Sequence, residues 1–405
     1  MGKIKSFFSY DRSLTSYVNE GGKKITLLSL AVPIFFESVL RVLMGTVNSM
    51  VLSRYTDTAA GAIGTATTII NFMTMLFSMI SAGVTVIIIQ NLGAGNRKRA
   101  ADAASLSIVF CGLLSLIVGL GISGFAPQLM GGVMKLQGQQ LEEAIAYFRI
   151  VSAYNVFSSL IMVLGAITKS YGNTKIPFLV AIIMNGFNAL FSSIVIFRPF
   201  EVPLYGITGV AYSCVIAQGL ALLIDIFFMM RMKIGISIKP VLKPDLSLVK
   251  EIIKFGLPSG VGTFSYSISV MVSTIFITGF GTLAVTTKAY LSSVTFYSAL
   301  VGQSMGQATS ILVGRNVGKG EMDRAYRLCL QTMKVSVLCN VTFATIMSIF
   351  TPQIFRLLFN ASDEVIKLAQ PVMFIDILTE AGRAMNNAEE GALRASGDVV
   401  FQMVF

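Results

Sequence analysis

The sequence predicts an all-α membrane protein built from two six-helix bundles related by a pseudo-two-fold axis along the membrane normal. Of its 405 residues, 54% are hydrophobic and 13% are charged, and the mean hydropathy is +0.75. Apolar stretches of about 20 residues, long enough to cross a bilayer, recur along the whole chain. Residues 33–180 are also echoed by residues 258–405, at a constant displacement of 225 residues. Because six helices separate equivalent positions, both halves keep one orientation.

Four anchors support the repeat at this single displacement. They are Pro33 with Pro258, NLGAG (91–95) with NVGKG (316–320), FAPQ (125–128) with FTPQ (350–353), and SYGN (170–173) with ASGD (395–398). The period is far too long for a solenoid. A large duplication within a membrane protein is typical of transporters whose halves move around a central site.

The apolar pattern predicts ten helices and the start of an eleventh near residue 398. Their ranges are 25–53, 61–91, 103–126, 141–168, 175–197, 207–231, 249–279, 284–313, 328–350 and 365–394. We expect a cytoplasmic segment (1–24), an N-lobe of helices 1–6 (25–231), a cytoplasmic connector (232–248) and a C-lobe (249–405). Since the first half continues past residue 180, the symmetry predicts twelve helices in an intact molecule, of which about ten and a half are present.

Basic residues predict the orientation. With a cytoplasmic N-terminus, 22 of the 31 Lys and Arg fall on the inner side and 7 on the outer side, while Arg41 and Arg383 lie within helices. This bias favours a cytoplasmic N-terminus, and the basic inner loops facing anionic lipid explain the net charge of +11. The polar first 24 residues lack the features of a cleaved signal peptide.

Enzyme and metal-site motifs are absent from the sequence. The chain has no histidine, and its four cysteines (Cys111, Cys214, Cys329 and Cys339) fall in apolar segments without metal-site spacing. It has no Walker loop, dinucleotide fingerprint or nucleophile elbow. We therefore expect no enzyme activity and no cofactor beyond a coupling proton or sodium ion. The expected partners are a small organic substrate and membrane lipid but no nucleic acid, and we expect the chain to work as a monomer.

Five motifs resemble the multidrug and toxic compound extrusion (MATE) family of bacterial transporters. They are LAVPIFFE (30–37), QNLGAGNRKRA (90–100), TKSYGNTKIP (168–177), GITGVA (206–211) and LRASGD (393–398). The resemblance covers essentially the whole chain. It implies twelve helices in two lobes, a central cavity between them, and antiport of organic compounds against protons or sodium across the cytoplasmic membrane.

The N-lobe departs from the family pattern. The family usually has an aspartate near the end of helix 1, where this chain has Asn48, and an Asn–Asp pair on helix 5, where it has Asn185 and Ala189. The acid that some members place on helix 7 is missing as well. Asn48 and Asn185 are therefore expected to be remnants of a polar site, and coupling has to depend on other residues or be lost.

Helix 10 carries the acids that could replace that site. At 100° per residue, one narrow stripe contains Asp376, Glu380, Arg383, Asn387 and Glu390. Each charge at the membrane centre costs at least about 2.5–3.5 kcal/mol, so the stripe must face protein or water. Residues 380–386 also resemble a motif of one bacterial branch of the family.

Two roles stay open for the intramembrane charges. Glu37 with Arg41 and Glu380 with Arg383 have helical spacing, so each pair can simply be structural. Alternatively, Glu37 with Arg383 and Arg41 with Glu380 lie at matching depths and can form a gate. Asp225, Glu389 and Glu390 lie near helix ends, and we expect them to snorkel or to contact loops.

These observations favour a secondary antiporter of the MATE type, within the wider MOP superfamily, that exports amphipathic organic cations by alternating access. Its candidate coupling and substrate residues are Glu37, Arg41, Asp376, Glu380, Arg383 and Asn387. Two alternatives remain. One is a lipid-linked oligosaccharide flippase of the same superfamily, which a cavity lined by Arg and Lys would favour. The other is a non-transporting receptor or scaffold derived from a transporter, which the loss of the N-lobe aspartates makes plausible.

Overall fold

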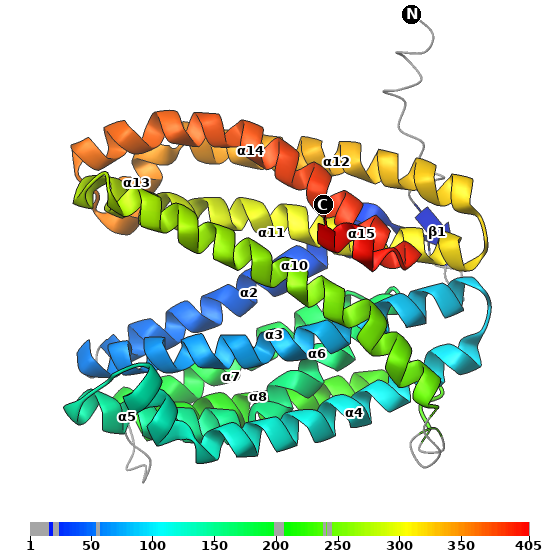
Figure 1. Ribbon diagram of the computed structural model, residues 1–405, viewed down its shortest axis with the longest axis horizontal. Helices are drawn as coiled ribbons and strands as arrows, with labels where there is room; N and C mark the ends of the chain where they lie inside the picture. Colours follow the sequence, from blue (N-terminus) through cyan, green and yellow to red (C-terminus); the bar gives the residue numbers. More distant parts are fainter. Residues whose placement is uncertain are drawn as a thin grey trace, which may run out of the picture. The chain divides into compact units, whose positions relative to one another are not determined.

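The computed structural model is almost entirely helical over the residues that it describes, namely 16–18, 24–53, 57–197, 206–237, 240 and 245–404. The long elements are α2 (Leu27–Ser53), α3 (Asp57–Gly93), α4 (Arg97–Gly124), α5 (Gly138–Ala153), α6 (Asn155–Ser170), α7 (Lys175–Phe197), α8 (Gly206–Arg231), α10 (Leu246–Thr278), α11 (Thr282–Gly318), α12 (Met322–Ile349) and α14 (Asp363–Ser396). The short ones are the strands β1 (Ser16–Val18) and β2 (Lys24–Thr26), the π-helical turn η1 (Gln128–Val133), α13 (Thr351–Phe359) and α15 (Val399–Val404). Figure 1 labels most of them along the chain. The all-α fold is confirmed.

The helix boundaries reproduce the sequence repeat. α3 and α11 are both 37 residues long and α4 and α12 are both 28 residues long, and the members of each pair begin 225 residues apart. The turns repeat as well. Gly95 and Gly320 have φ of 76° and 79°, in the left-handed region that glycine adopts without strain. Equivalent glycines therefore lie in the turns that follow equivalent helices.

The prediction of one continuous helix is wrong in one place. The helix expected over 141–168 is two helices, α5 and α6, which meet at Tyr154 with a bend of 46°. Its counterpart in the second half, α14, runs unbroken for 34 residues, although Pro371 lies within it. The hairpin β1–β2 and the helix α13 were not expected either.

Membrane-spanning character is clear in most of these helices. Among the described residues, seven are long and apolar enough to cross a bilayer, or eight if α5 and α6 form one bent span. α11 and α14 are long enough but too polar to meet the same criterion. α14 carries charged side chains along its whole length, among them Asp376, Glu380 and Arg383.

The chain divides into two compact units. The N-terminal unit comprises residues 36–91 and 96–260, and the C-terminal unit comprises residues 1–35, 92–95 and 261–405. Residues 1–15 and 19–23 of the expected cytoplasmic segment, and residues 238–239 and 241–244 of the connector, lie outside the described residues.

In the N-terminal unit, α3 and α10 cross at glycines. A Cβ on Gly83 would lie 2.2 Å from the carbonyl oxygen of Ile252, and one on Gly256 would lie 2.2 Å from that of Met79. Because glycine has no side chain, the backbones of α3 and α10 can approach closely at these positions. Small residues serve the same purpose between membrane helices in general. A separate apolar core around Phe148 joins α5 to α8.

In the C-terminal unit, α11 and α14 form the most extensive helix pair, with α12 packed against both (Figure 1). α12 contributes hydroxyl groups that bond to the α14 backbone: Ser336 Oγ donates to the Ala384 oxygen at 3.3 Å, and Ser348 Oγ donates to the Met373 oxygen at 2.8 Å. Beyond the end of α12, the buried Phe355 of α13 packs in a cluster with Met373 of α14. Together these contacts hold α14 in a fixed register.

Candidate functional site

The α14 stripe, defined as Asp376, Glu380, Arg383 and Asn387, is buried at its centre. Glu380 is fully buried, and its Oε1 accepts a hydrogen bond from Arg383 Nη1 one turn away. Arg383 is 27% exposed, and Asp376 is half-buried within electrostatic range of Arg383. The prediction that this face is turned away from lipid is therefore confirmed for Glu380.

Asn340 of α12 completes the environment of Glu380. Its Nδ2 donates to Glu380 Oε2 at 2.8 Å and to the Glu380 carbonyl oxygen at 3.2 Å. Sequence reasoning missed Asn340. A signal was present, because α12 has small or polar side chains at every fourth position. These are Ser336, Asn340, Ala344 and Ser348, and all four are buried.

Glycines of α11 make room for the stripe. A Cβ on Gly302 would lie 2.8 Å from Asn387 Nδ2, and one on Gly306 would lie 2.4 Å from the Asn387 carbonyl oxygen. Asn387 Nδ2 donates to the Arg383 carbonyl oxygen at 2.9 Å. α11, α12 and α14 thus enclose an acid, a base and two amides within one unit.

Replacing Asn340 with Ala is expected to lower the free energy of unfolding by about 1–3 kcal/mol, because a buried carboxylate oxygen loses its donor. The measurement is unfolding of the purified protein by a denaturing detergent. Asn386→Ala, which removes an exposed amide of α14, is the matched control and should change little. Equal destabilisation by both variants would contradict this role.

A second cluster, defined as Glu37, Arg41, Lys169 and Asp225, lies within the N-terminal unit. Glu37 is 4% exposed and accepts a hydrogen bond from Arg41 Nη2 at 3.0 Å. Lys169 Nζ, from α6, lies 3.4 Å from each carboxylate oxygen of Glu37. Asp225 of α8 is close enough to interact electrostatically with Glu37 and Lys169.

Asp225 does not behave as expected from the sequence. It is fully buried, and neither carboxylate oxygen has a hydrogen-bond partner. The prediction that it snorkels or contacts a loop is wrong, since α8 packs against α6 and α7 and turns this position inward. Sequence reasoning also missed Lys169 as the partner of Glu37, because the two lie on helices that are distant in the chain.

Each predicted acid–base pair forms within its own helix, although Glu37 also contacts Lys169 of α6. Glu37 bonds to Arg41 and Glu380 bonds to Arg383, which is the structural alternative considered for both pairs. Glu390 likewise pairs with Arg394, while Glu389 is exposed.

Of the two expected N-lobe remnants, the structure describes the side chain of Asn185. Asn185 is half-buried, and its Nδ2 donates to the Ala181 carbonyl oxygen at 2.8 Å. The side chain of Asn48 lies outside the described residues. Among the residues that are described, no group of three His, Cys, Asp or Glu is arranged to hold a metal ion.

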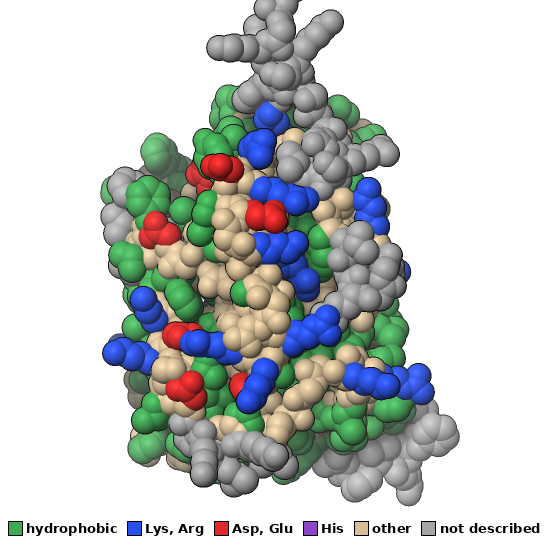
Figure 2. All heavy atoms as spheres, turned by 90° about the vertical axis from the view of Figure 1, so that its right-hand side faces the viewer, with side chains coloured by type: hydrophobic (Ala, Val, Ile, Leu, Met, Phe, Trp, Pro, Cys, Tyr) green, Lys and Arg blue, Asp and Glu red, His purple; other side chains and the backbone are tan. Residues whose placement is uncertain are grey.

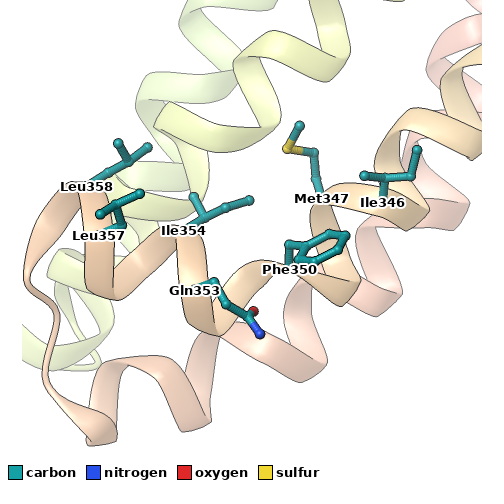
Figure 3. A pocket seen from close by; sticks show the side chains of 7 residues that line it. All are labelled: Ile346, Met347, Phe350, Gln353, Ile354, Leu357 and Leu358. Atoms are coloured by element: carbon teal, nitrogen blue, oxygen red, sulfur yellow. The ribbon is translucent and has the colours of Figure 1, made fainter.

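An apolar groove lies at the corner between α12 and α13 (Figure 3). Its lining is Ile346, Met347, Phe350, Gln353, Ile354, Leu357 and Leu358. Leu357 is 85% exposed, so this surface suits contact with lipid chains better than recognition of a charged molecule. Elsewhere, Lys and Arg side chains are prominent on the face drawn in Figure 2.

Comparison with known proteins identifies the fold. Structures of a MATE protein in complex with MaD3S and of a MOP superfamily transporter from Pyrococcus furiosus superpose with TM-scores of 0.85 and 0.83, at 17% and 18% identity. Each comparison covers 93% of this chain and 84% of the other chain.

Sequence comparison extends this to the family. The chain is 33% identical to the uncharacterized transporter YisQ of Bacillus subtilis, over 96% of this chain and 85% of YisQ. It is 24% identical to the probable multidrug resistance protein NorM of Thermotoga maritima, over 93% of this chain and 81% of that protein. The MatE family model matches residues 33–194 and 258–405, which contain the two copies of the repeat. The chain therefore belongs to the MatE family, the MATE transporters.

Proposed function

We propose that the chain is a secondary antiporter that exports amphipathic organic cations across the bacterial cytoplasmic membrane, driven by a proton or sodium gradient. It works as a monomer by alternating access, with its N-terminus in the cytoplasm. The observation that carries the proposal is the buried Glu380, held by Arg383 and Asn340 inside a family of transporters. Several relatives are named as multidrug resistance proteins, which supports the substrate class.

The α14 stripe has the chemistry that antiport requires. A carboxylate in a site of low polarity can bind a proton or a cation, and a neighbouring guanidinium opposes that binding. A substrate that draws Arg383 away from Glu380 would change the affinity of Glu380 for the coupling ion. Asp376, half-buried one turn away, offers a second carboxylate for the substrate cation, and Asn387 supports the backbone at Arg383.

The test is uptake of lipophilic cations into inverted vesicles that contain the chain, with either a proton or a sodium gradient imposed. We expect accumulation with one of the two gradients and none with vesicles that lack the protein. If no cation in a broad panel moves with either gradient, the proposal is wrong. Translocation of a lipid-linked oligosaccharide in the same vesicles would support the flippase alternative instead.

A further inference from the structure

Asp225 lies in apolar surroundings without a polar partner. Leu222 and Met229, about one turn away on either side of it on α8, are buried in a cluster that includes Leu164 of α6. An ionised carboxylate without donors in such surroundings is very costly, whereas a protonated one costs far less. The surroundings of Asp225 therefore favour the protonated form of its carboxyl group.

Lys169 is the cation that interacts electrostatically with Asp225, and its ion pair differs from that of its counterpart in the repeat. Its counterpart in the second half is Arg394, which bonds to Glu390 four residues earlier on its own helix. The position four residues before Lys169 is Gly165, so Lys169 has no acid there and reaches α2 instead. Both of its distances to Glu37 are 3.4 Å, longer than an ordinary N–H···O bond. Glu37 is also bonded to Arg41 and does not depend on Lys169 alone.

Within the described part of the chain, few other charged groups lie near Asp225. Glu37 from α2 and Lys169 from α6 are the groups whose fields reach it. α7, which packs along α8, has a single charged residue, the exposed Lys175. α5 meets α8 at its other end, around Ile207 and Val210. Among the described residues, Lys169 is therefore the cation available to the carboxylate that Asp225 would become on losing a proton.

We propose that Asp225 is a proton-binding site of the N-terminal unit, and that Lys169 is shared between Asp225 and Glu37 as the proton comes and goes. This rests on the proposed function, since it adds a proton carrier to the same transport cycle. When the carboxyl group of Asp225 loses its proton to water, its carboxylate draws the ammonium group of Lys169, while Glu37 keeps Arg41. When a proton returns, Lys169 goes back to Glu37.

Infrared difference spectroscopy on the purified full chain tests this without any substrate. Spectra are recorded between about pH 5 and about pH 9, a range that spans the titration of perturbed carboxyl groups. The Glu380→Gln protein is used so that Glu380 does not contribute. We expect the C=O band of a protonated carboxylic acid to disappear as the pH rises. The band should be lost when Asp225→Asn is added, and kept when the exposed Asp323 is changed to Asn.

Lys169→Met gives an independent readout that leaves Asp225 in place. A nearby ammonium group favours the ionised carboxylate, so its removal is expected to move the disappearance of the band to higher pH. Absence of any such band, its persistence in the Asp225→Asn protein, or no shift in the Lys169→Met protein would overturn the proposal.

Measurements of transport distinguish the proton-binding role of Asp225 from the proposed antiport function. Asp225→Asn in the otherwise unchanged chain is expected to lose uptake driven by a proton gradient in inverted vesicles. If the unchanged chain transports and Asp225→Asn is equally active, Asp225 is not a carrier, while the proposed function stands. If the unchanged chain moves no cation, the proposed function fails, and the infrared band still decides whether Asp225 binds a proton.

Discussion

Replacing Glu380 with Gln is expected to reduce gradient-driven transport to the level of vesicles without the protein. The Gln side chain has nearly the same size, and its amide oxygen can still accept hydrogen bonds from Arg383 or Asn340. It cannot bind and release a proton, and it has no charge to offer a sodium ion. The helices should therefore stay folded while coupling is lost, and transport under each imposed gradient is the measurement.

Glu389→Gln is the matched control for this variant. Glu389 lies on the same helix with its side chain exposed, so its neutralisation should leave transport unchanged. Unchanged coupling in the Glu380→Gln protein, together with damage from changes at Asn48, would return the coupling site to the N-lobe. A loss in both Glu variants would indicate a general effect of charge on α14.

Gly391→Ala is expected to have the largest effect on folding. A Cβ at Gly391 would lie 2.2 Å from the carbonyl oxygen of Gly306, so α11 and α14 would have to separate. Overpacking costs about 1–3 kcal/mol, and here the obstacle is backbone, which cannot rotate away as a side chain can. The separation would also move Asn387, whose carbonyl oxygen lies against Gly306. We expect a marked loss of thermal stability in detergent together with a loss of transport.

Gly382→Ala provides the comparison within the same helix. Nothing lies within 4 Å of a Cβ at Gly382, and Ala is the better helix former by about 1 kcal/mol. That variant should be as stable as the unchanged chain or slightly more stable. Equal melting temperatures for the two Ala variants would show that the α11–α14 contact does not limit stability.

The all-α fold could be predicted from the sequence because the features that indicate it are either local to one helix or repeated in both halves. Apolar length predicted where the helices lie, and the 225-residue displacement predicted that α3 and α11 match. The break at Tyr154 could not be predicted in this way, because the segment has no Pro or Gly there and the bend depends on the packing of α5 and α6 against other helices.

The candidate site was only partly predictable, for a related reason. Helical periodicity placed Glu380 and Arg383 on one face, since it concerns a single helix. Asn340, Lys169 and Asp225 acquire their roles from contacts between helices, which periodicity does not describe. The position of Asp225 near a helix end suggested access to water, whereas the structure buries it completely.

α14 runs without a break from Asp363 to Ser396, in contrast with α5 and α6, which meet at a bend of 46°. Glu380 and Arg394 are 14 residues apart, about 21 Å at 1.5 Å per residue, with no break between them. The repeat places Asn155, the first residue after the joint at Tyr154, at the position equivalent to Glu380. A tilt of α14 at Glu380 would therefore also move the helix end at Gly397, whereas in the first half the bend at Tyr154 lies between the equivalent positions and α5.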